Sequence, residues 1–243
     1  MKVIILAAGR GKRMTGETQT KPKCLVKVAG RPLIDWQLAA YHDLGITDIG
    51  VVTGYKSQML EEYPIKKFHN SEWASTNMVY SLLAARDWLE SDECIIGYSD
   101  LFFLAPGLIP LRDSVSNLSV LFDPNWRQLW EMRFDNPLSD AETFRINDKS
   151  LITEIGYKAK TIEEIQGQYM GLIKIAPEAW GRVLNALDNL SLTQVKNLQM
   201  THLLQLLIEA KSLDVCSIPY FGFWSEVDSQ TDLALLNSQL PFL

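Results

Sequence analysis

The chain begins with a short apolar run that leads directly into a turn containing two glycines. Residues 3–14 read VIILAAGRGKRM, so Gly9 and Gly11 lie one residue apart and are surrounded by basic side chains. A short apolar run closed by glycine is typical of a strand buried in a parallel sheet. Ligands of open α/β sheets gather at the carboxyl ends of such strands, so the feature predicts both a fold class and the place of a site.

The rest of the chain continues this pattern and then changes it. Apolar strands expected at residues 3–7, 49–53 and 94–98 alternate with helices at 32–44, 56–62 and from Ser75 or Thr76 to about Glu90, which predicts a parallel sheet with helices on both faces. Beyond residue 103 we expect hairpin-like strands at 118–122, 144–147, 152–155 and 168–175, helices at 177–187 and 193–210, strands at 215–218 and 223–227, and a last helix at 229–240. One α/β domain over residues 1–243, with three α/β/α layers and a mixed, mostly parallel sheet, is the simplest interpretation.

Composition limits the classes of partner. The formal net charge of −6 argues against a general nucleic-acid binder, and no apolar run approaches the roughly 18 residues that a membrane span needs. The first apolar run is too short for a secretory signal, and three widely spaced cysteines suit a reducing compartment, so we expect a cytoplasmic protein without membrane insertion. Basic residues cluster near the N-terminus, which suits a small polyanionic ligand.

The glycine turn fits neither of two common phosphate-binding motifs. A dinucleotide fold would place a third glycine where Met14 stands, and a P-loop would require Gly-Lys-Ser/Thr. A glycine pair still brings backbone N–H groups close to phosphate oxygens, and Arg13 adds a planar donor. Lys21 and Lys23 flank the rigid Pro22. A solvated basic loop is the alternative, but the combination favours phosphate binding.

These residues carry a family resemblance. The segments LAAGRGKRM and KPKCLVKVAGRPLIDW resemble the N-terminal signature of nucleotidyltransferases, whose fold is a glycosyltransferase-A-like Rossmann variant (nucleotide-diphospho-sugar transferase-like). Residues 15–20, TGETQT, depart from the Pro-Leu-Thr usual at this place. The segment FHNSEWASTNMVYSLLAAR resembles bacterial phosphocholine and phosphonate cytidylyltransferases, with Met78 in place of a second asparagine. The resemblance implies that about residues 1–110 bind the nucleotide and about 111–228 bind the acceptor.

Two aspartates are candidate ligands of a magnesium ion. Asp100 follows the strand at 94–98, and Asp228 follows the strand at 223–227. Each has a simpler interpretation, since Asp100 could shape a turn and Asp228 could cap the last helix. The resemblance implies that both hold Mg²⁺, with Glu226 nearby, although relatives often carry Asp-x-Asp where this chain has Tyr-Ser-Asp.

The resemblance also implies roles in nucleotide binding. Lys23 would lie between the α-phosphate and the incoming acceptor, and Arg13 would hold the β/γ end of the triphosphate, which makes these two the expected catalytic residues. Asn77 and Ser81 could read the polar edge of cytosine, or could serve only in the first turn of a helix. The full expected nucleotide site is Leu6, Ala8, Gly9, Gly11, Lys12, Arg13, Gly54, Tyr55, Asn77 and Ser81.

Candidates for the acceptor site are less specific. Aromatic faces beside a carboxylate suit a quaternary or primary ammonium, and Trp126, Trp130 and Tyr169 with Glu131 offer both. Lys158 could hold the acceptor phosphate. Each tryptophan could equally be a core residue, and Lys158 could belong to an ordinary basic turn.

The resulting hypothesis is a Mg²⁺-dependent cytidylyltransferase. It would transfer CMP from CTP to a small phosphorylated or phosphono amine or amino-alcohol, such as phosphocholine or 2-aminoethylphosphonate, and release pyrophosphate. The alternatives are a sugar-1-phosphate nucleotidyltransferase that uses UTP or dTTP, and a non-catalytic nucleotide-binding regulator. The sequence leaves the acceptor and the oligomeric state open, a homodimer included.

Overall fold

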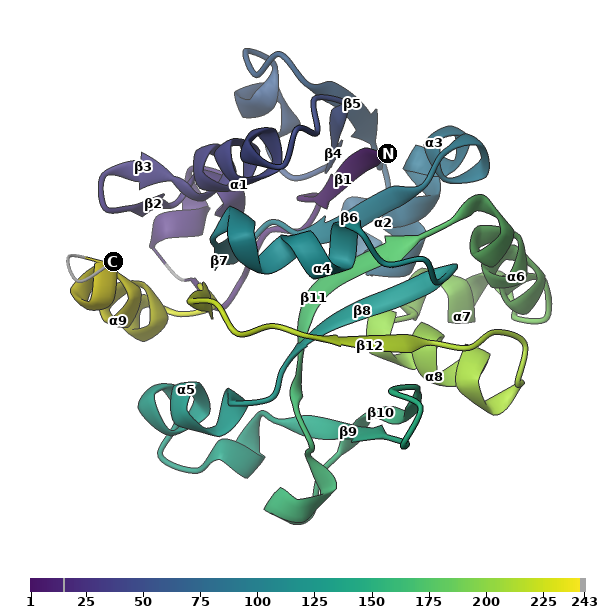
Figure 1. The fold of residues 1–243 in the computed structure, drawn as a ribbon. Helices are drawn as coiled ribbons and strands as arrows, with labels where there is room; N and C mark the ends of the chain where they lie inside the picture. The colour runs from purple at the N-terminus through teal and green to yellow at the C-terminus, as the bar shows by residue number, and fades with distance from the viewer. Residues whose placement is uncertain (15, 241–243) are drawn as a thin grey trace.

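The architecture is organised by a seven-stranded sheet at the centre of the molecule (Figure 1). The computed structural model describes residues 1–14 and 16–240, so Thr15, within the unusual stretch 15–20, lies outside the described residues. The strand order is β12 (Cys216–Pro219), β8 (Leu118–Asp123), β11 (Gln168–Ile175), β6 (Cys94–Tyr98), β1 (Lys2–Leu6), β4 (Ile49–Thr53) and β5 (Lys66–His69).

One strand of this sheet runs against its neighbours. β1 pairs in parallel with β4 and β6, and β5 and β12 are also parallel to their partners, whereas β11 is antiparallel to both β6 and β8. The start of β11 therefore lies at the same edge as the carboxyl ends of β6 and β8. The expected mixed, mostly parallel sheet is confirmed, and the antiparallel strand brings Gln168 and Tyr169 to the edge where ligands bind in open α/β sheets.

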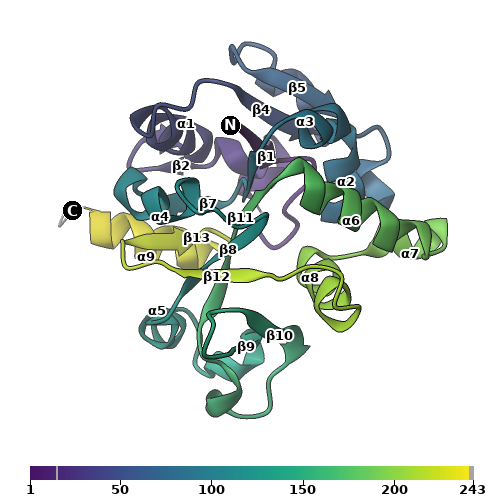
Figure 2. The ribbon, with the colours of Figure 1, turned by 45° about the vertical axis from the view of Figure 1, so that its right-hand side comes forward.

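Helices cover both faces of the sheet (Figure 2). Alternate side chains of β1 point to opposite faces, so Ile4 and Leu6 enter one apolar cluster and Val3 and Ile5 enter the other. The first cluster contains side chains of α2 (Met78–Leu82), α3 (Arg86–Ser91), α6 (Pro177–Asp188) and α8 (Met200–Glu209); the second contains those of α1 (Leu33–Asp43), α4 (Ile109–Arg112) and α5 (Trp126–Arg133). Among the described residues, no helix is both long and apolar enough to cross a membrane.

Three small two-stranded sheets extend this framework. β9 (Glu142–Ile146) and β10 (Ile152–Lys158) form an antiparallel pair, β7 (Leu101–Phe103) pairs with β13 (Trp224–Glu226), and β2 (Lys27–Val28) pairs with β3 (Arg31–Pro32). The last helix, α9 (Gln230–Gln239), follows β13 and packs through Leu236 against Met14, Val28 and Val227. The two ends of the described chain thereby contribute to one region of the molecule.

The helices differ from expectation in their boundaries. The helix expected to end near Glu90 begins with Asn77 as its cap, whose Oδ1 accepts from the backbone N–H of Met78, and a 3₁₀ turn at Leu83–Ala85 separates α2 from α3. The helix expected at 193–210 consists of α7 (Leu192–Asn197) and α8, because Leu198 and Gln199 are extended. Helix α5 and strands β5 and β7 were not predicted.

Two buried tyrosines form a matched pair for measuring the effect of an unpartnered hydroxyl on stability. Both have side chains 1% exposed or less, yet the hydroxyl of Tyr41 has no hydrogen-bond partner among the described residues, whereas that of Tyr220 donates to the carbonyl of Phe223 at 3.0 Å. We expect Tyr41→Phe to leave the free energy of unfolding unchanged or raise it by up to about 1 kcal/mol, and Tyr220→Phe to lower it by about 1 kcal/mol. Urea denaturation measures both, and equal losses would contradict the assignment.

Candidate active site

Sheet topology brings two distant aspartates together at the carboxyl edge of the central sheet. Asp100 follows β6 and directly precedes β7, and β13 lies antiparallel to β7 with Glu226 opposite Leu101. The backbone N–H of Val227 donates to the carbonyl of Asp100 at 2.9 Å. Because backbone hydrogen bonds fix this register, the side chains of Asp100 and Asp228 face the same point.

That point is occupied by the ammonium of Lys23. Its Nζ lies 2.6 Å from Oδ2 of Asp100 and also contacts Oδ1 of Asp228. Lys23 is 8% exposed and begins a short 3₁₀ helix directly after Pro22. Burial alone lowers the pKa of Lys23, but the two carboxylates outweigh it, so the pKa lies above its ordinary value and the amine is protonated.

The glycine turn packs directly against this lysine. Gly11 has a φ of +68°, and a Cβ at that position would lie 3.1 Å from Cδ of Lys23. The hydroxyl of Thr18 donates to the carbonyls of Gly11 and Met14, both at 2.9 Å, and so holds the turn. Glycine is therefore required here both for its left-handed conformation and for the close approach of Lys23.

Arg13 extends from the same turn to the same aspartate. Its Nη2 lies 2.9 Å from Oδ2 of Asp228, while 69% of its side chain is exposed. Arg13, Lys23, Asp100 and Asp228, which the sequence predicted to share one site, are thus brought together. The exposed guanidinium of Arg13 can reach an anion without leaving the turn.

A second cation lies behind the aspartates. The side chain of Arg133, at the end of α5, is 1% exposed; its Nη1 lies 3.0 Å from Oε2 of Glu226, and its Nε lies 2.9 Å from Oδ1 of Asp232. Its guanidinium carbon is 4.8 Å from the ring centroid of Trp130 and 5.0 Å from that of Phe134. Arg133 is therefore enclosed by carboxylates and aromatic faces.

Asp232 transmits this interaction to the backbone next to Asp228. Its Oδ2 accepts from the backbone N–H groups of Asp228 at 3.1 Å and Ser229 at 2.9 Å, in the capping box of α9. Ser229, and not Asp228, is the helix cap, so the side chain of Asp228 is free to face Lys23. Burial raises the pKa of Glu226 to about 7, although Arg133 opposes this shift.

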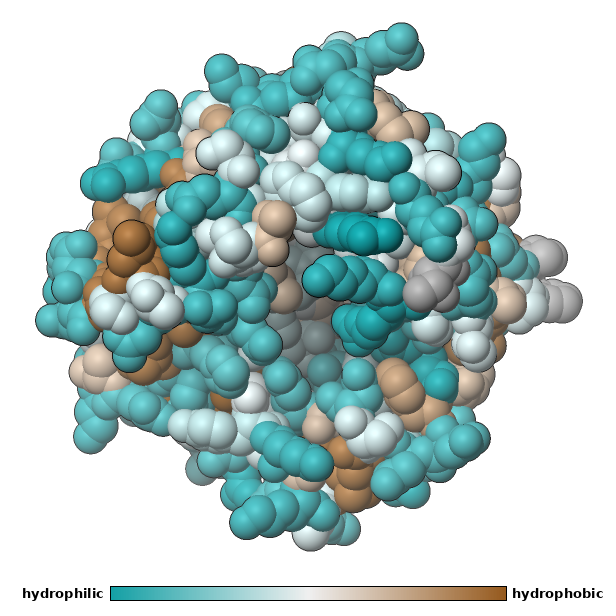
Figure 3. Space-filling view, turned by 180° about the vertical axis from the view of Figure 1, so that it is seen from behind, coloured by the Kyte–Doolittle hydropathy of each residue, from teal (hydrophilic) through white to brown (hydrophobic). Residues whose placement is uncertain are grey.

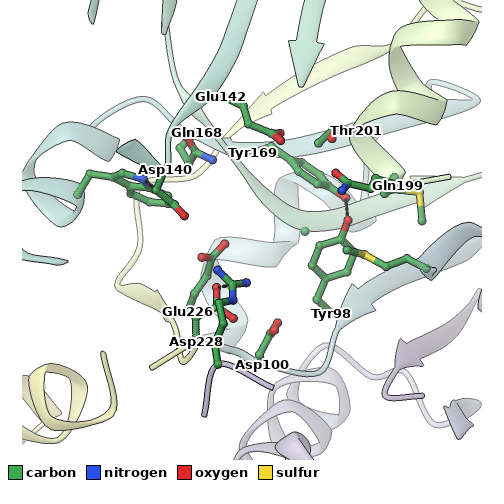
Figure 4. Close-up of a pocket in the computed structure, with 15 residues that line it drawn as sticks. Tyr98, Asp100, Asp140, Glu142, Gln168, Tyr169, Gln199, Thr201, Glu226 and Asp228 are labelled. Atoms are coloured by element: carbon green, nitrogen blue, oxygen red, sulfur yellow. Dashed lines mark hydrogen bonds and ion pairs between the residues drawn. The ribbon is translucent and has the colours of Figure 1, made fainter. Parts of the chain in front are cut away.

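A cavity of about 270 Å³ opens beside these charges (Figure 4). Asp100, Glu226 and Asp228 lie at one end, and Glu142, Gln168 and Thr201 lie at the other. The hydroxyls of Tyr98 and Tyr169 meet at 3.3 Å between the two ends. The remaining lining residues are Arg13, Met78, Trp130, Asp140, Gly171, Gln199 and Met200. From the side opposite to Figure 1, a hollow rimmed largely by hydrophilic side chains is visible in the surface (Figure 3).

A smaller cavity of about 100 Å³ lies over the end of β1. It is lined by Leu6, Ala8, Gly9, Trp73, Thr76, Asn77, Met78 and Ser81, five of which belong to the expected nucleotide site. Met78 lines both cavities. A molecule seated in the small cavity would therefore end next to one seated in the large cavity.

The polar groups of the small cavity are already hydrogen bonded. Asn77 caps α2 through Oδ1, and the hydroxyl of Ser81 donates to the carbonyl of Asn77 at 3.1 Å and accepts from Asn70 at 3.0 Å. Gly54 supports the wall, because a Cβ there would lie 2.5 Å from Cβ of Trp73. Tyr55 donates its backbone N–H to Ala8 and contacts the Trp73 ring edge to face. Lys12 is exposed on the turn.

Three of the expected acceptor residues do not line the large cavity. Trp126 is buried in the core and donates its indole N–H to the carbonyl of Ile165 at 3.2 Å. Glu131 lies on the exposed side of α5, paired with Arg127. Lys158 is exposed at the end of β10, opposite Glu142 in the strand register. Of that set, Trp130 and Tyr169 do line it.

Other lining residues had no signal in the sequence. Glu142 begins β9, Gln168 begins β11, and Thr201 lies in the first turn of α8, so they come from elements far apart in the chain. Each is a single polar residue outside any recognisable motif. The antiparallel course of β11 brings Gln168 to this edge of the central sheet, whereas Glu142 comes from the separate β9–β10 sheet and Thr201 from α8.

Comparison with known proteins gives a consistent result. Residues 3–111 match the MobA-like NTP transferase domain. The chain is 35% identical to the CTP:phosphoglutamine cytidylyltransferase of Campylobacter jejuni, over 96% of this chain and 98% of the relative. It is 36% identical to the choline-phosphate cytidylyltransferase of Streptococcus pneumoniae over 42% of this chain and 46% of the relative. The solved CTP:phosphocholine cytidylyltransferase of S. pneumoniae shares the fold, with a TM-score of 0.74 and 21% identity over 98% of both chains.

The Arg133 cluster provides a test of the stability of this site. Arg133→Met removes the buried cation and leaves Glu226 and Asp232 without it, which we expect to lower the free energy of unfolding by about 3–5 kcal/mol. Arg127→Met, six residues earlier on α5 and exposed, is the matched control and should change the free energy of unfolding by less than about 1 kcal/mol. Denaturant unfolding measures both, and a small loss for Arg133→Met would exclude the central structural role.

Proposed function

This chain belongs to the family of nucleotidyltransferases with a MobA-like NTP transferase domain, and from that premise we propose that it is a cytidylyltransferase that joins CMP from CTP to a small phosphorylated or phosphono amine. The observation that carries the proposal is the convergence of Arg13, Lys23, Asp100 and Asp228 beside two neighbouring cavities. One cavity would take the nucleoside and the other the acceptor. Their common residue, Met78, lies where the two substrates would meet.

The residues present suit a magnesium ion. Asp100 and Asp228 already converge on one cation, the ammonium of Lys23, and carboxylate oxygens are the ligands that Mg²⁺ prefers. Asp100 and Asp228 would hold the ion, and phosphate oxygens and waters would complete its coordination. When bound, it would supply neutralisation of the negative charge that gathers on the phosphates.

In the proposed transfer, the protein needs only to position the two substrates and to stabilise the negative charge on the phosphates. An oxygen of the acceptor's phosphate attacks the α-phosphorus of CTP, a new P–O bond forms, and the bond to the β-phosphate breaks with release of pyrophosphate. The attacking oxygen is already ionised, so no general base is needed. Lys23, released from its two carboxylates, would stabilise charge on the α-phosphate, and the exposed Arg13 would hold the leaving pyrophosphate.

The nucleotide assignment is supported by the small cavity. The backbone of Ala8 and Gly9 and the side chain of Leu6 form one wall, and Trp73 forms another. A planar ring inserted there would place its attached phosphates over the glycine turn and toward Arg13 and Lys23. The relatives named as cytidylyltransferases favour cytosine as that ring.

Nucleotide preference is the first measurement. Pyrophosphate release is assayed with CTP, UTP, ATP and GTP against phosphoglutamine, phosphocholine, 2-aminoethylphosphonate and glucose 1-phosphate. We expect CTP to be preferred by at least about tenfold in kcat/KM and an amine-bearing acceptor to exceed glucose 1-phosphate. A preference for UTP with glucose 1-phosphate would replace the proposal with a sugar-nucleotide enzyme. Stabilisation by CTP without turnover would indicate a regulator.

The roles of the charged residues are tested by substitution. Lys23→Met removes the cation directed at the transferred phosphate, and Asp100→Asn removes one of the two carboxylates that would hold the metal ion. Each change should lower kcat by about 10²-fold or more. Lys21→Met is the matched control, since Lys21 is paired with Glu17 at 2.6 Å instead of with Asp100 or Asp228. Steady-state kinetics with thermal unfolding as a folding check measures all three. Retained activity in Asp100→Asn would remove the metal assignment.

A further inference from the structure

The end of the large cavity farthest from Asp100 and Asp228 carries two carboxylates and an amide, those of Asp140, Glu142 and Gln168. Resting on the proposed function, we propose that Glu142, Asp140 and Gln168 bind an N–H-bearing ammonium of the acceptor and discriminate against a trimethylammonium group. Figure 4 shows Glu142 and Gln168 across the cavity from Asp100 and Asp228. An acceptor whose phosphate lies at one end would place its amine at the other.

The carboxylates at this end lack cationic partners. Among the described side chains, no lysine, arginine or histidine forms an ion pair with Glu142 or Asp140. Both are half-buried, and Asp140 accepts a hydrogen bond from the indole N–H of Trp130 at 3.2 Å. Two partly desolvated carboxylates without a counterion form a site for a cation.

Gln168 adds an independent observation. Only 9% of it is exposed, and its Oε1 is buried with no hydrogen-bond partner among the described residues. Its amide reaches the cavity beside Glu142 (Figure 4). Burying an unpaired amide is unfavourable, and an amide that turns about its last bond can offer either its oxygen or its nitrogen to a ligand. The unused hydrogen-bonding capacity therefore lies where the carboxylates lie.

The aromatic residues of the cavity argue against a cage for a quaternary ammonium. One face of Trp130 is covered by the guanidinium of Arg133 at 4.8 Å. Tyr98 and Tyr169 meet edge to face with their centroids 5.9 Å apart, and their hydroxyls are joined. A trimethylammonium has no N–H to donate, so it would cover Glu142 and Gln168 without hydrogen bonding to either. A primary ammonium can donate three hydrogen bonds.

Two acceptors that differ only in three methyl groups test the inference. Phosphoethanolamine and phosphocholine present the same phosphate at the same distance from the nitrogen. We expect kcat/KM with CTP to be at least about tenfold higher for phosphoethanolamine. Equal or higher kcat/KM for phosphocholine would overturn the inference while leaving the cytidylyltransferase proposal in place.

Binding without turnover separates this inference from the proposed function. Calorimetry of each acceptor with the nucleotide-free protein should give tighter binding of phosphoethanolamine even if no nucleotide is consumed. Equal or tighter binding of phosphocholine, or no binding of phosphoethanolamine, would overturn the inference. Absence of pyrophosphate release with every nucleotide and acceptor would instead overturn the proposed function.

Substitution locates the effect at the named residues. Glu142→Gln keeps the side-chain size and removes the charge. We expect KM for phosphoethanolamine to rise about tenfold or more, KM for phosphocholine, which has only the Coulomb attraction to lose, to rise less, and kcat at saturation to be largely kept for both. Glu131→Gln, exposed on α5 and paired with Arg127, is the matched control and should change neither constant. Equal effects of Glu142→Gln on both acceptors would overturn the proposed recognition of the N–H groups by Glu142.

Discussion

The site depends on the ion pairs that Lys23 forms with Asp100 and Asp228. Lys23 comes from the short 3₁₀ helix after Pro22, Asp100 from the end of β6 and Asp228 from the segment after β13, and the β7–β13 pairing holds the two aspartates in register. Without the ammonium of Lys23, the partly buried carboxylates of Asp100 and Asp228 would repel each other at this end of the cavity. The two carboxylates can therefore lie this close together only when a cation lies between them. Lys23 is that cation in this structure, and the proposed magnesium ion would be that cation during the reaction.

Two buried cations serve the same acidic cluster in different ways. Lys23 contacts carboxylates that face the cavity, so a substrate or an ion can take its place. Arg133 contacts Glu226 and Asp232 with its guanidinium near the rings of Trp130 and Phe134, and it does not itself line the cavity. Arg133 holds the backbone around Asp228 through Asp232, whereas Lys23 contacts the carboxylate of Asp228 on the side that faces the cavity. In the proposed mechanism Lys23 moves to the phosphates, while Arg133 stays with Glu226 and Asp232.

The sequence predicted the elements with strong local signals and missed those without them. Strands at 49–53, 94–98 and 168–175 agree with the structure residue for residue, because they are short apolar runs bounded by turns. The interruption between α2 and α3 and the division of α7 from α8 depend on packing between distant segments, which periodicity does not report. Helix α5 carries Trp126, Leu129 and Trp130 at helical spacing within a polar segment, so its apolar face was interpreted as isolated aromatic residues.

The same distinction applies to the site. The residues proposed to face the phosphates had signals in the sequence. Arg13 and Lys23 lie in one N-terminal motif, and Asp100 and Asp228 each follow an expected strand at a place that the family resemblance marks. The residues proposed for the acceptor are single polar side chains, and no local pattern distinguishes Glu142 in the cavity from Glu131 on the surface. Only the antiparallel course of β11 and the position of the β9–β10 hairpin decide between them.

The two ends of the large cavity are built by different segments of the chain. The side chains proposed to bind the phosphates come from the first quarter of the chain, from the end of β6 and from the segment after β13. Asp140, Glu142 and Gln168, proposed for the acceptor, lie within residues 140–168, which include the β9–β10 hairpin. Substitutions within residues 140–168 would therefore change the end of the cavity proposed for the acceptor and leave Arg13, Lys23, Asp100 and Asp228 in place. The same fold could in this way take different acceptors while the residues proposed for nucleotidyl transfer stay unchanged.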